Sequence, residues 1–197
     1  MMAIYEFEGV VPVVHPQAFV HPDAVLIGDV RIGPDCYIGP GASLRGDFSA
    51  VVLGPGCNVQ DNAVLHGTPG LDTVVDAGGH IGHGAVVHAC TVGANALIGI
   101  NAVVFDRATI GESAMVAAMA FIPSGFVVPP RHLAAGVPAR LVRELSEADI
   151  AWKDKGTLAY QRLAGRSRLT LRPCAPLAEA EPGRRPLDIT AFWPEDC

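Results

Sequence analysis

An aliphatic residue recurs every six positions between residues 20 and 127, and this period constrains the fold more than any other feature of the sequence. From Val20 the chain reads VHPDAV, LIGDVR, IGPDCY, IGPGAS and LRGDFS, and we call the Val, Leu or Ile that opens each unit its leader. The leaders are Val20, Leu26, Ile32, Ile38, Leu44, Leu53, Val59, Leu65, Ile81, Val87, Val92, Ile98, Val104, Ile110, Val116 and Ile122. A period of six fits neither a helix nor strict strand alternation. It predicts short strands and tight turns that coil around an axis, with the leaders pointing inward.

Two interruptions break the repeat, near residues 49–52 and at residues 67–80. A small residue follows many leaders four places later, as Ala24, Cys36 and Ala42 do, and we expect it to pack against the leader. Glycine often stands directly after a leader, where we expect it to permit unusual backbone angles at the corner of the coil.

The pattern divides the chain into repeats at residues 1–145, a helix at 146–171 and an extended tail at 172–197. Ser146 with Asp149 is typical of a helix start. We expect the helix to lie along the repeats and to be interrupted near Gly156. Its predicted apolar stripe consists of Ile150, Trp152, Leu158, Tyr160 and Leu163. The tail, rich in proline and charge, is expected to run over a neighbouring subunit or to be partly disordered.

Composition excludes several kinds of partner. Charged residues make up 17% of the chain, below the usual share of about 25%, which suggests that some faces are buried against other chains. The net charge of -6 argues against nucleic acid, because phosphates attract basic patches. No apolar run reaches the roughly 20 residues of a membrane span, and the N-terminus lacks a basic signal-peptide region. We therefore expect a cytoplasmic protein. The five cysteines form no C-x-x-C pair, so no disulfide framework is expected.

Three of the seven histidines have informative positions in the repeat. His66 and His88 each follow a leader directly, so they are expected to stack about 5 Å apart on one face. His83 stands two places after its leader, and a corner separates it from His88. The three can share one ion only if two come from one subunit and the third from the next. Three imidazoles suit Zn, with Fe or Co as alternatives, and leave a coordination position open for catalysis. The alternative is three solvated surface histidines; for His15, His21, His80 and His132 that reading is preferred.

A specific resemblance is carried by RGD at 45–47, NVQDNAVLH at 58–66 and IGHGAVVHAC at 81–90. Together these motifs resemble the γ-class carbonic anhydrases, a hexapeptide-repeat family. The resemblance implies a left-handed parallel β-helix with three hexapeptides per coil, a C-terminal α-helix and a homotrimer. It also implies one metal, bound by His66 and His88 of one subunit and by His83 of its neighbour.

The same resemblance assigns roles to other residues. Gln60 matches the residue that hydrogen-bonds the water on the metal, and Asn58 and Asp61 match companions near the site. Arg45 and Asp47 match an ion pair at the subunit interface that could contact an anion; a simple surface pair is the alternative. Tyr160 matches a tyrosine that hangs over the metal, with ordinary helix packing as the alternative. The family's proton-carrying glutamates have no counterpart in residues 67–80, which contain only Asp72 and Asp76.

The full length is most similar to the branch of this class that contains the phenylacetate-degradation protein PaaY and the carnitine-pathway protein CaiE. The similarity is carried by AFVHPDAVLIGDV, RELSEADIAWKDKGTLAYQ and PLAEAEPGRRPL. The class implies a zinc lyase that hydrates CO2 reversibly to bicarbonate by means of a metal-bound hydroxide. The branch implies the alternative, hydrolysis of aromatic acyl-CoA thioesters at the same metal. GVPAR at 136–140 is similar to hexapeptide acyltransferases, which are a third option, and a non-catalytic trimeric scaffold is a fourth.

Overall fold

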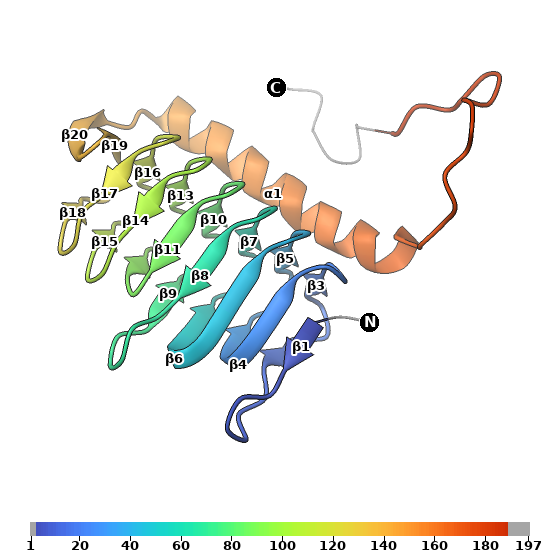
Figure 1. Ribbon diagram of the computed structural model, residues 1–197. Coiled ribbons are helices and arrows are strands. Elements are labelled where there is room, and N and C mark those ends of the chain that lie inside the picture. The colour runs from blue at the N-terminus through green and yellow to red at the C-terminus, as the bar shows by residue number, and fades with distance from the viewer. Residues whose placement is uncertain (1–2, 189–197) are drawn as a thin grey trace.

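The repeats fold into a parallel β-solenoid of about seven turns, followed by one helix (Figure 1). The computed structural model describes residues 3–188. All the leaders named above are buried, most of them with an exposed fraction of 0%. They stack from coil to coil: Val87 lies beside Leu65 on one neighbour and Val104 on the other. The predicted parallel β-helix with a C-terminal helix is therefore confirmed, and its core is a column of leaders and small residues.

Each complete coil contributes a short strand to each of three faces. The first face contains β8 (Val64–His66), β11 (Val86–His88), β14 (Val103–Val104) and β17 (Phe121–Ile122). The second contains β9 (Thr73–Val75), β12 (Thr91–Val92), β15 (Thr109–Ile110) and β18 (Val127–Val128). The third contains β3 (Phe19–Val20), β5 (Tyr37–Ile38), β7 (Asn58–Val59), β10 (His80–Ile81), β13 (Leu97–Ile98), β16 (Met115–Val116) and β19 (His132–Gly136), with β20 (Ala139–Glu144) antiparallel at its end.

Two long strands, β4 (Val25–Ile32) and β6 (Ser43–Leu53), span the first and second faces, and β1 (Ala3–Tyr5) and β2 (Val13–Val14) pair with β4. The first interruption of the repeat is therefore absorbed within β6. The second is shorter than expected, because β9 resumes the coil at Thr73 and places the fully buried Val75 in the core column.

The corner glycines have a different role from the one expected. Positive φ angles occur three residues after a leader, at Asp35 (56°), Asn62 (59°) and Asn101 (54°), for example, and not directly after it. The glycine after the leader is instead required by a close approach of neighbouring coils. A Cβ atom on Gly54 would lie 2.7 Å from the nitrogen of Ala77, a distance that real side chains do not adopt.

The helix α1 (Glu147–Thr170) crosses the coils on the outside of the third face (Figure 1). A capping box begins it: the Ser146 hydroxyl accepts from the Asp149 N–H at 3.2 Å, and the Asp149 carboxylate accepts from the Ser146 N–H at 2.8 Å. The expected interruption near Gly156 is wrong, because the helix continues through it.

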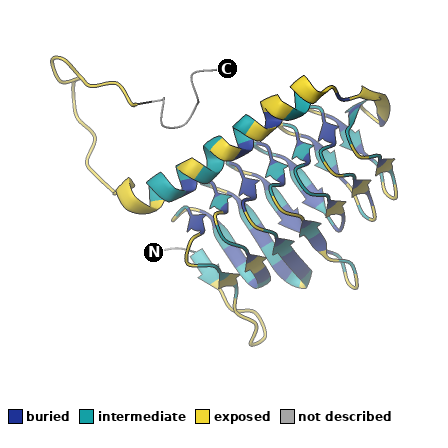
Figure 2. Cartoon of the chain, turned by 180° about the vertical axis from the view of Figure 1, so that it is seen from behind, coloured by how far each residue is buried: buried dark blue, intermediate teal, exposed yellow. Residues whose placement is uncertain are grey.

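The expected apolar stripe of the helix is also wrong. Its buried residues are Lys153, Thr157 and Ala164, whereas Trp152 and Leu158 are exposed. Polar side chains make part of the contact between the helix and the corners of the coils. The Lys153 ammonium donates to the Gly78 carbonyl at 2.8 Å, and Gln161 donates to the Gly56 carbonyl at 3.3 Å. Figure 2 shows the resulting contrast between a buried solenoid interior and a largely exposed outer helix surface.

Residues 171–188 contain no helix or strand and are exposed throughout. The rest of the predicted tail, including Cys197, lies outside the described residues. The four cysteines within the described part of the chain are free thiols, three of them buried. No helix of the described chain is long and apolar enough to cross a membrane.

Candidate metal centre

His66 and His88 lie side by side on β8 and β11, as their positions in the repeat predict. The Nδ1 atom of His66 is 3.2 Å from Nε2 of His88. The outer nitrogen of each ring contacts a carboxylate: Nε2 of His66 is 2.8 Å from Asp47, and Nδ1 of His88 is 2.6 Å from Asp106. The pair is therefore held from both sides, with its two inner nitrogens facing each other.

The two facing nitrogens have the properties of metal ligands. An ionised carboxylate only accepts hydrogen bonds, so each neutral ring carries its proton on the outer nitrogen. The inner nitrogens of His66 and His88 then present two lone pairs at 3.2 Å, which repel unless a cation lies between them. Two imidazoles on a tetrahedral Zn²⁺ have nitrogens about 3.3 Å apart. Carboxylates on the outer nitrogens are the usual second contacts of such ligands. These residues therefore fit a divalent metal.

Arg45 extends this network from the neighbouring strand β6. Its guanidinium donates to Asp47 at 2.5 Å, so Asp47 joins Arg45 to His66. Burial works to raise the pKa of the Asp47 carboxyl, but the hydrogen bond from His66 and the charge of Arg45 outweigh it and hold the pKa below its usual value. The carboxylate thus stays ionised and keeps the proton of His66 on Nε2. Aromatic rings flank the pair: the ring centroid of Phe48 is 5.3 Å from that of His66, and the ring centroid of Phe105 is 5.9 Å from that of His88.

His83 lies at a different corner, between the third and first faces, as its position in the repeat predicts. Its Nδ1 atom is 2.5 Å from the carboxylate of Asp61, so this ring too has its outer nitrogen on a carboxylate. Its side chain is 45% exposed. Within the described residues of one chain, no group of three or more His, Cys, Asp or Glu side chains could hold a metal ion. His83 therefore does not form a three-ligand group with His66 and His88 within the described residues of one chain.

Gln60 lies on the third face beside His83 and is only 3% exposed. Its amide nitrogen donates to Oδ1 of Asn58 at 3.0 Å and lies 2.6 Å from Nε2 of His80. Asn58 is fully buried, and its own Nδ2 atom has no hydrogen-bond partner within the described residues. A buried donor without a partner is costly, at about 1–3 kcal/mol. The cost marks this polar cluster as one that packing alone does not explain.

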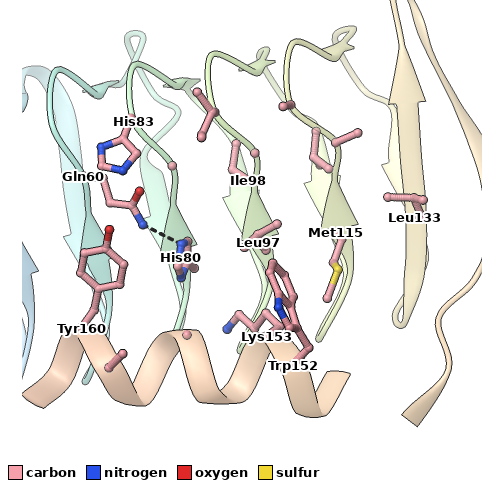
Figure 3. A pocket seen from close by; sticks show the side chains of 18 residues that line it. Gln60, His80, His83, Leu97, Ile98, Met115, Leu133, Trp152, Lys153 and Tyr160 are labelled. Atoms are coloured by element: carbon pink, nitrogen blue, oxygen red, sulfur yellow. Dashed lines mark hydrogen bonds between the residues drawn. The ribbon is translucent and has the colours of Figure 1, made fainter. Parts of the chain in front are cut away.

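A cavity of about 410 Å³ lies between α1 and the third face (Figure 3). Gln60, His83 and Tyr160 line one end, and the rest is largely apolar, with Leu97, Met115, Leu133 and Trp152 among its walls. The Tyr160 ring packs between the rings of Tyr37 and His80, each centroid 5.4 Å away. Burial, with the nearby Tyr37 and Asp61, raises the pKa of Tyr160 to about 12, so it remains a neutral phenol. Tyr160 thus closes one end of the cavity, and packing accounts for much of its position.

Comparison with known proteins identifies the family. Residues 12–46 match the family model described as bacterial transferase hexapeptide (six repeats). The carnitine operon protein CaiE of Escherichia coli K12 is 49% identical over 189 residues, which cover 96% of each chain. The chain belongs to the CaiE family of hexapeptide-repeat proteins. A hexapeptide transferase family protein of Anaplasma phagocytophilum is 39% identical, with a TM-score of 0.79, and covers 82% of this chain and 96% of its own. A Bacillus cereus protein described as a candidate acetyltransferase is 30% identical, with a TM-score of 0.83, and the match covers 84% of this chain and 96% of the Bacillus chain.

Membership of the CaiE family confirms the resemblance to that branch, whereas the reaction has to be inferred from the site.

Sequence reasoning missed two of the site's residues. Asp106 follows its leader by two places, as His83 and Asp61 do, and this shared corner position was the available signal. His80 was read as a surface histidine, but it is half-buried, contacts Gln60 and lines the cavity. Of the remaining histidines, His15 and His21 stand directly before turns and accept backbone N–H groups, and His132 begins β19 and contacts the Pro130 carbonyl.

Proposed function

We propose that this protein is a metal-dependent hydrolase that activates water with one divalent ion, zinc by preference, and attacks the carbonyl carbon of an acyl-CoA thioester. The observation that carries the metal proposal is the shared arrangement of three histidines. His66, His83 and His88 each have one ring nitrogen on a carboxylate. Each therefore offers its other nitrogen as a ligand, and three such ligands leave a position open for a reacting water.

We further propose that the site forms between subunits of a homotrimer. His66 and His88 lie on the first face, while His83 belongs to the corner of the third face and cannot join them within its chain. A cyclic assembly solves this, because each subunit can present its His83 corner to the His66–His88 pair of the next. Exposed Phe48 and Phe105 beside the pair offer apolar surface for such a contact.

The chemistry requires a water that is nucleophilic at neutral pH. A divalent ion bound by three imidazoles supplies it by lowering the pKa of water to about 7. Gln60 would orient that water, and the Asp47, Asp61 and Asp106 carboxylates hold the imidazoles in the required tautomers. In hydrolysis the water oxygen bonds to the carbonyl carbon and the C–S bond breaks. One water proton goes to the departing CoA thiolate and the other leaves the new carboxylic acid, so the products are free CoA and a carboxylate.

The cavity favours an acyl substrate over CO2. Its volume of about 410 Å³ lies within the roughly 300–1,000 Å³ of pockets that take organic ligands, and its walls suit an apolar or aromatic acyl group. CO2 has three atoms and needs no such space. Fast CO2 hydration also requires proton export, and the loop at 67–80 contributes no glutamate. Its Asp72 accepts hydrogen bonds from Ser49 and Ala50, which fasten the loop to β6.

Reversible CO2 hydration remains the second candidate. The three histidines and Gln60 would serve this reaction equally well, because activated water can attack either carbon. Acyl transfer is the reaction that the names of the relatives favour. Transfer would form an acylated acceptor instead of a free carboxylate, so the products distinguish it from hydrolysis.

The test is metal analysis followed by both assays on one preparation. We expect bound metal, release of CoA together with free acid from aromatic acyl-CoA substrates, and loss of both in His83→Ala. His21→Ala, which alters a turn histidine, is the matched control and should retain both. Absence of metal would support a scaffold instead. CoA release only in the presence of an added acceptor would support a transferase.

A cavity variant separates the two hydrolytic candidates. Ala118 lines the cavity and is exposed, so Ala118→Trp should fill the acyl site without disturbing the core. We expect it to raise KM for acyl-CoA and to leave CO2 hydration unchanged. Val127→Trp, at an exposed position on β18 away from the cavity lining, is the control. An unchanged KM in Ala118→Trp would remove the support that the cavity gives to a thioester substrate.

A further inference from the structure

Three polar side chains form a hydrogen-bonded chain on the third face, at the end of the cavity where the reaction is proposed. Asn58 and His80 are direct neighbours on strands β7 and β10. Gln60 bridges them: its amide nitrogen lies 3.0 Å from Oδ1 of Asn58 and 2.6 Å from Nε2 of His80, the contact drawn as a dashed line in Figure 3. Gln60 and Asn58 are almost completely buried, so water does not compete for these bonds.

The chain fixes which atoms carry hydrogen. An amide nitrogen has two hydrogens and no lone pair to offer, so the Gln60 nitrogen donates in both contacts. Nε2 of His80 must then be an acceptor, and the proton of the neutral ring lies on Nδ1. That Nδ1 atom is buried and has no hydrogen-bond partner within the described residues. The Nδ1–H group of His80 thus lacks an acceptor while Nε2 accepts from Gln60. This unsatisfied donor is the energetic cost of keeping the Gln60 amide in place.

We propose that His80 is a positioning residue that holds the Gln60 amide with its oxygen, and not its nitrogen, toward the reacting water; the role of this water rests on the proposed function. The Gln60 oxygen points away from His80, to the side on which His83 lies (Figure 3). An oxygen can only accept, so it takes a hydrogen of the attacking water and leaves a water lone pair free for the substrate carbon. An amide free to flip would present N–H instead and would occupy that lone pair.

The surroundings of His80 keep its ring in one orientation and in the neutral form. Its edge-to-face contact with Tyr160, at an interplanar angle of 90°, fixes the ring plane. Gly156 of α1 lies next to the ring, at a distance where a Cβ atom would make an ordinary contact, 4.0 Å, with Cε1 of His80. Burial, followed by the charges of Lys153 and His83, lowers the pKa of His80 to about 3. The ring therefore stays neutral, and Nε2 stays an acceptor throughout the physiological range.

The tautomer can be measured without any assay. In metal-free protein with ¹⁵N-labelled histidine, two-bond proton–nitrogen correlations distinguish a protonated from an unprotonated ring nitrogen. We expect His80 with Nδ1 protonated and Nε2 unprotonated at neutral pH, and unchanged down to pH 5. The opposite tautomer, or an imidazolium, would overturn the proposal, because the Gln60 nitrogen could then no longer face His80. This result is independent of whether the protein hydrolyses thioesters.

Kinetics test the consequence. His80→Phe keeps a ring against Tyr160 but removes the acceptor. We expect kcat to fall by about 10–100-fold, with metal content and KM unchanged, whereas a purely structural loss would lower metal content and the unfolding temperature as well. His80→Gln supplies an acceptor oxygen and should restore most of kcat. His21→Phe is the control at a turn histidine and should leave all these quantities unchanged. Full kcat in a folded, metal-loaded His80→Phe variant would contradict a positioning role. If His80→Phe does not fold, His80→Gln and His80→Ala are compared instead, and equal kcat values of these two variants would contradict the role.

Discussion

Two edges of the solenoid carry histidines, and they are built in opposite ways. The metal edge, formed by His66, His88 and their carboxylate partners, is held by paired strands and charged contacts. The cavity edge, formed by His83, Gln60, His80 and Tyr160, lies under a helix and opens into an apolar space. The first provides two of the proposed ligands, and the second provides the third beside the apolar cavity. In the proposed trimer each subunit would contribute half of two different sites, which accords with the absence of a three-ligand group within the described residues of one chain.

The largest effect should come from separating the two edges on different chains. His66→Ala and His83→Ala trimers should each lose metal and activity, because each proposed site then lacks one ligand. Co-expression of the two variants should restore activity, since a mixed cyclic trimer contains one interface with all three histidines. Activity and metal content of the purified mixed trimer, isolated with two tags, are the measurements. A mixed trimer without activity or metal would place all three ligands on one chain and would refute the interface site.

The next effect is the pH dependence of stability that arises from Lys153, which joins α1 to the solenoid through the Gly78 carbonyl. Burial lowers the pKa of Lys153 to about 8, below the ordinary value of 10.5. The unfolded chain then binds more protons between these values, so the free energy of unfolding should rise with pH from about 8 to 10.5. The contribution of this group is at most about 3 kcal/mol. Below pH 8 the full cost of charging the buried amine opposes folding.

Urea unfolding at fixed protein concentration measures this slope. Lys153→Met should lose the rise above pH 8, whereas Lys155→Met, at the other lysine of α1, should keep it. If the slopes of wild type and Lys153→Met coincide, the Lys153 amine is not desolvated and the helix does not cover it as described.

The metal edge should be less sensitive to its carboxylates than to its histidines. Asp106 holds the outer nitrogen of His88 at 2.6 Å. Asp106→Asn keeps the shape but weakens this acceptor, and loss of such a second contact lowers metal affinity by about 10–100-fold. Competition with a chelator measures the affinity, and Asp35→Asn, at a corner on the third face, is the control. Equal affinities would mean that Asp106 does not orient His88 in the loaded protein.

The two edges were not equally predictable from the sequence. The metal edge follows from the repeat itself, because equivalent positions on successive coils must stack, and this placed His66 beside His88 and excluded His83. The cavity edge depends on α1, whose contacts carry no apolar period. Lys153 is buried there because its ammonium donates to the Gly78 carbonyl and to the Asn95 side chain. The buried Thr157 hydroxyl donates to the Lys153 carbonyl of the same helix. Hydrophobic spacing reveals neither contact. His80 was misjudged for the same reason, since Tyr160 of the helix covers part of its ring.

The corners show a second limit of sequence reasoning. Glycine after a leader was expected to serve unusual backbone angles, whereas positive φ angles lie two residues further on and are often adopted by Asn, Asp or Ser. Both roles select small or turn-forming residues, so composition alone cannot separate them. Only the distance between coils does so, as at Gly82, where a Cβ atom would lie 2.8 Å from the Ile98 carbonyl oxygen.

The smallest expected effect tests how closely α1 approaches the cavity edge. Gly156→Ala should stabilise the protein by about 0.5–1 kcal/mol through helix propensity, because the new methyl would meet Cε1 of His80 only at 4.0 Å, an ordinary contact. Gly165→Ala, also in α1, has no atom within 4 Å of its new methyl and reports the propensity gain alone. Equal gains in unfolding temperature would support the described spacing. A gain at Gly165 with a loss at Gly156 would mean that the helix lies closer to His80 than described, and kcat of Gly156→Ala should then fall as well, because the ring that holds Gln60 would be displaced.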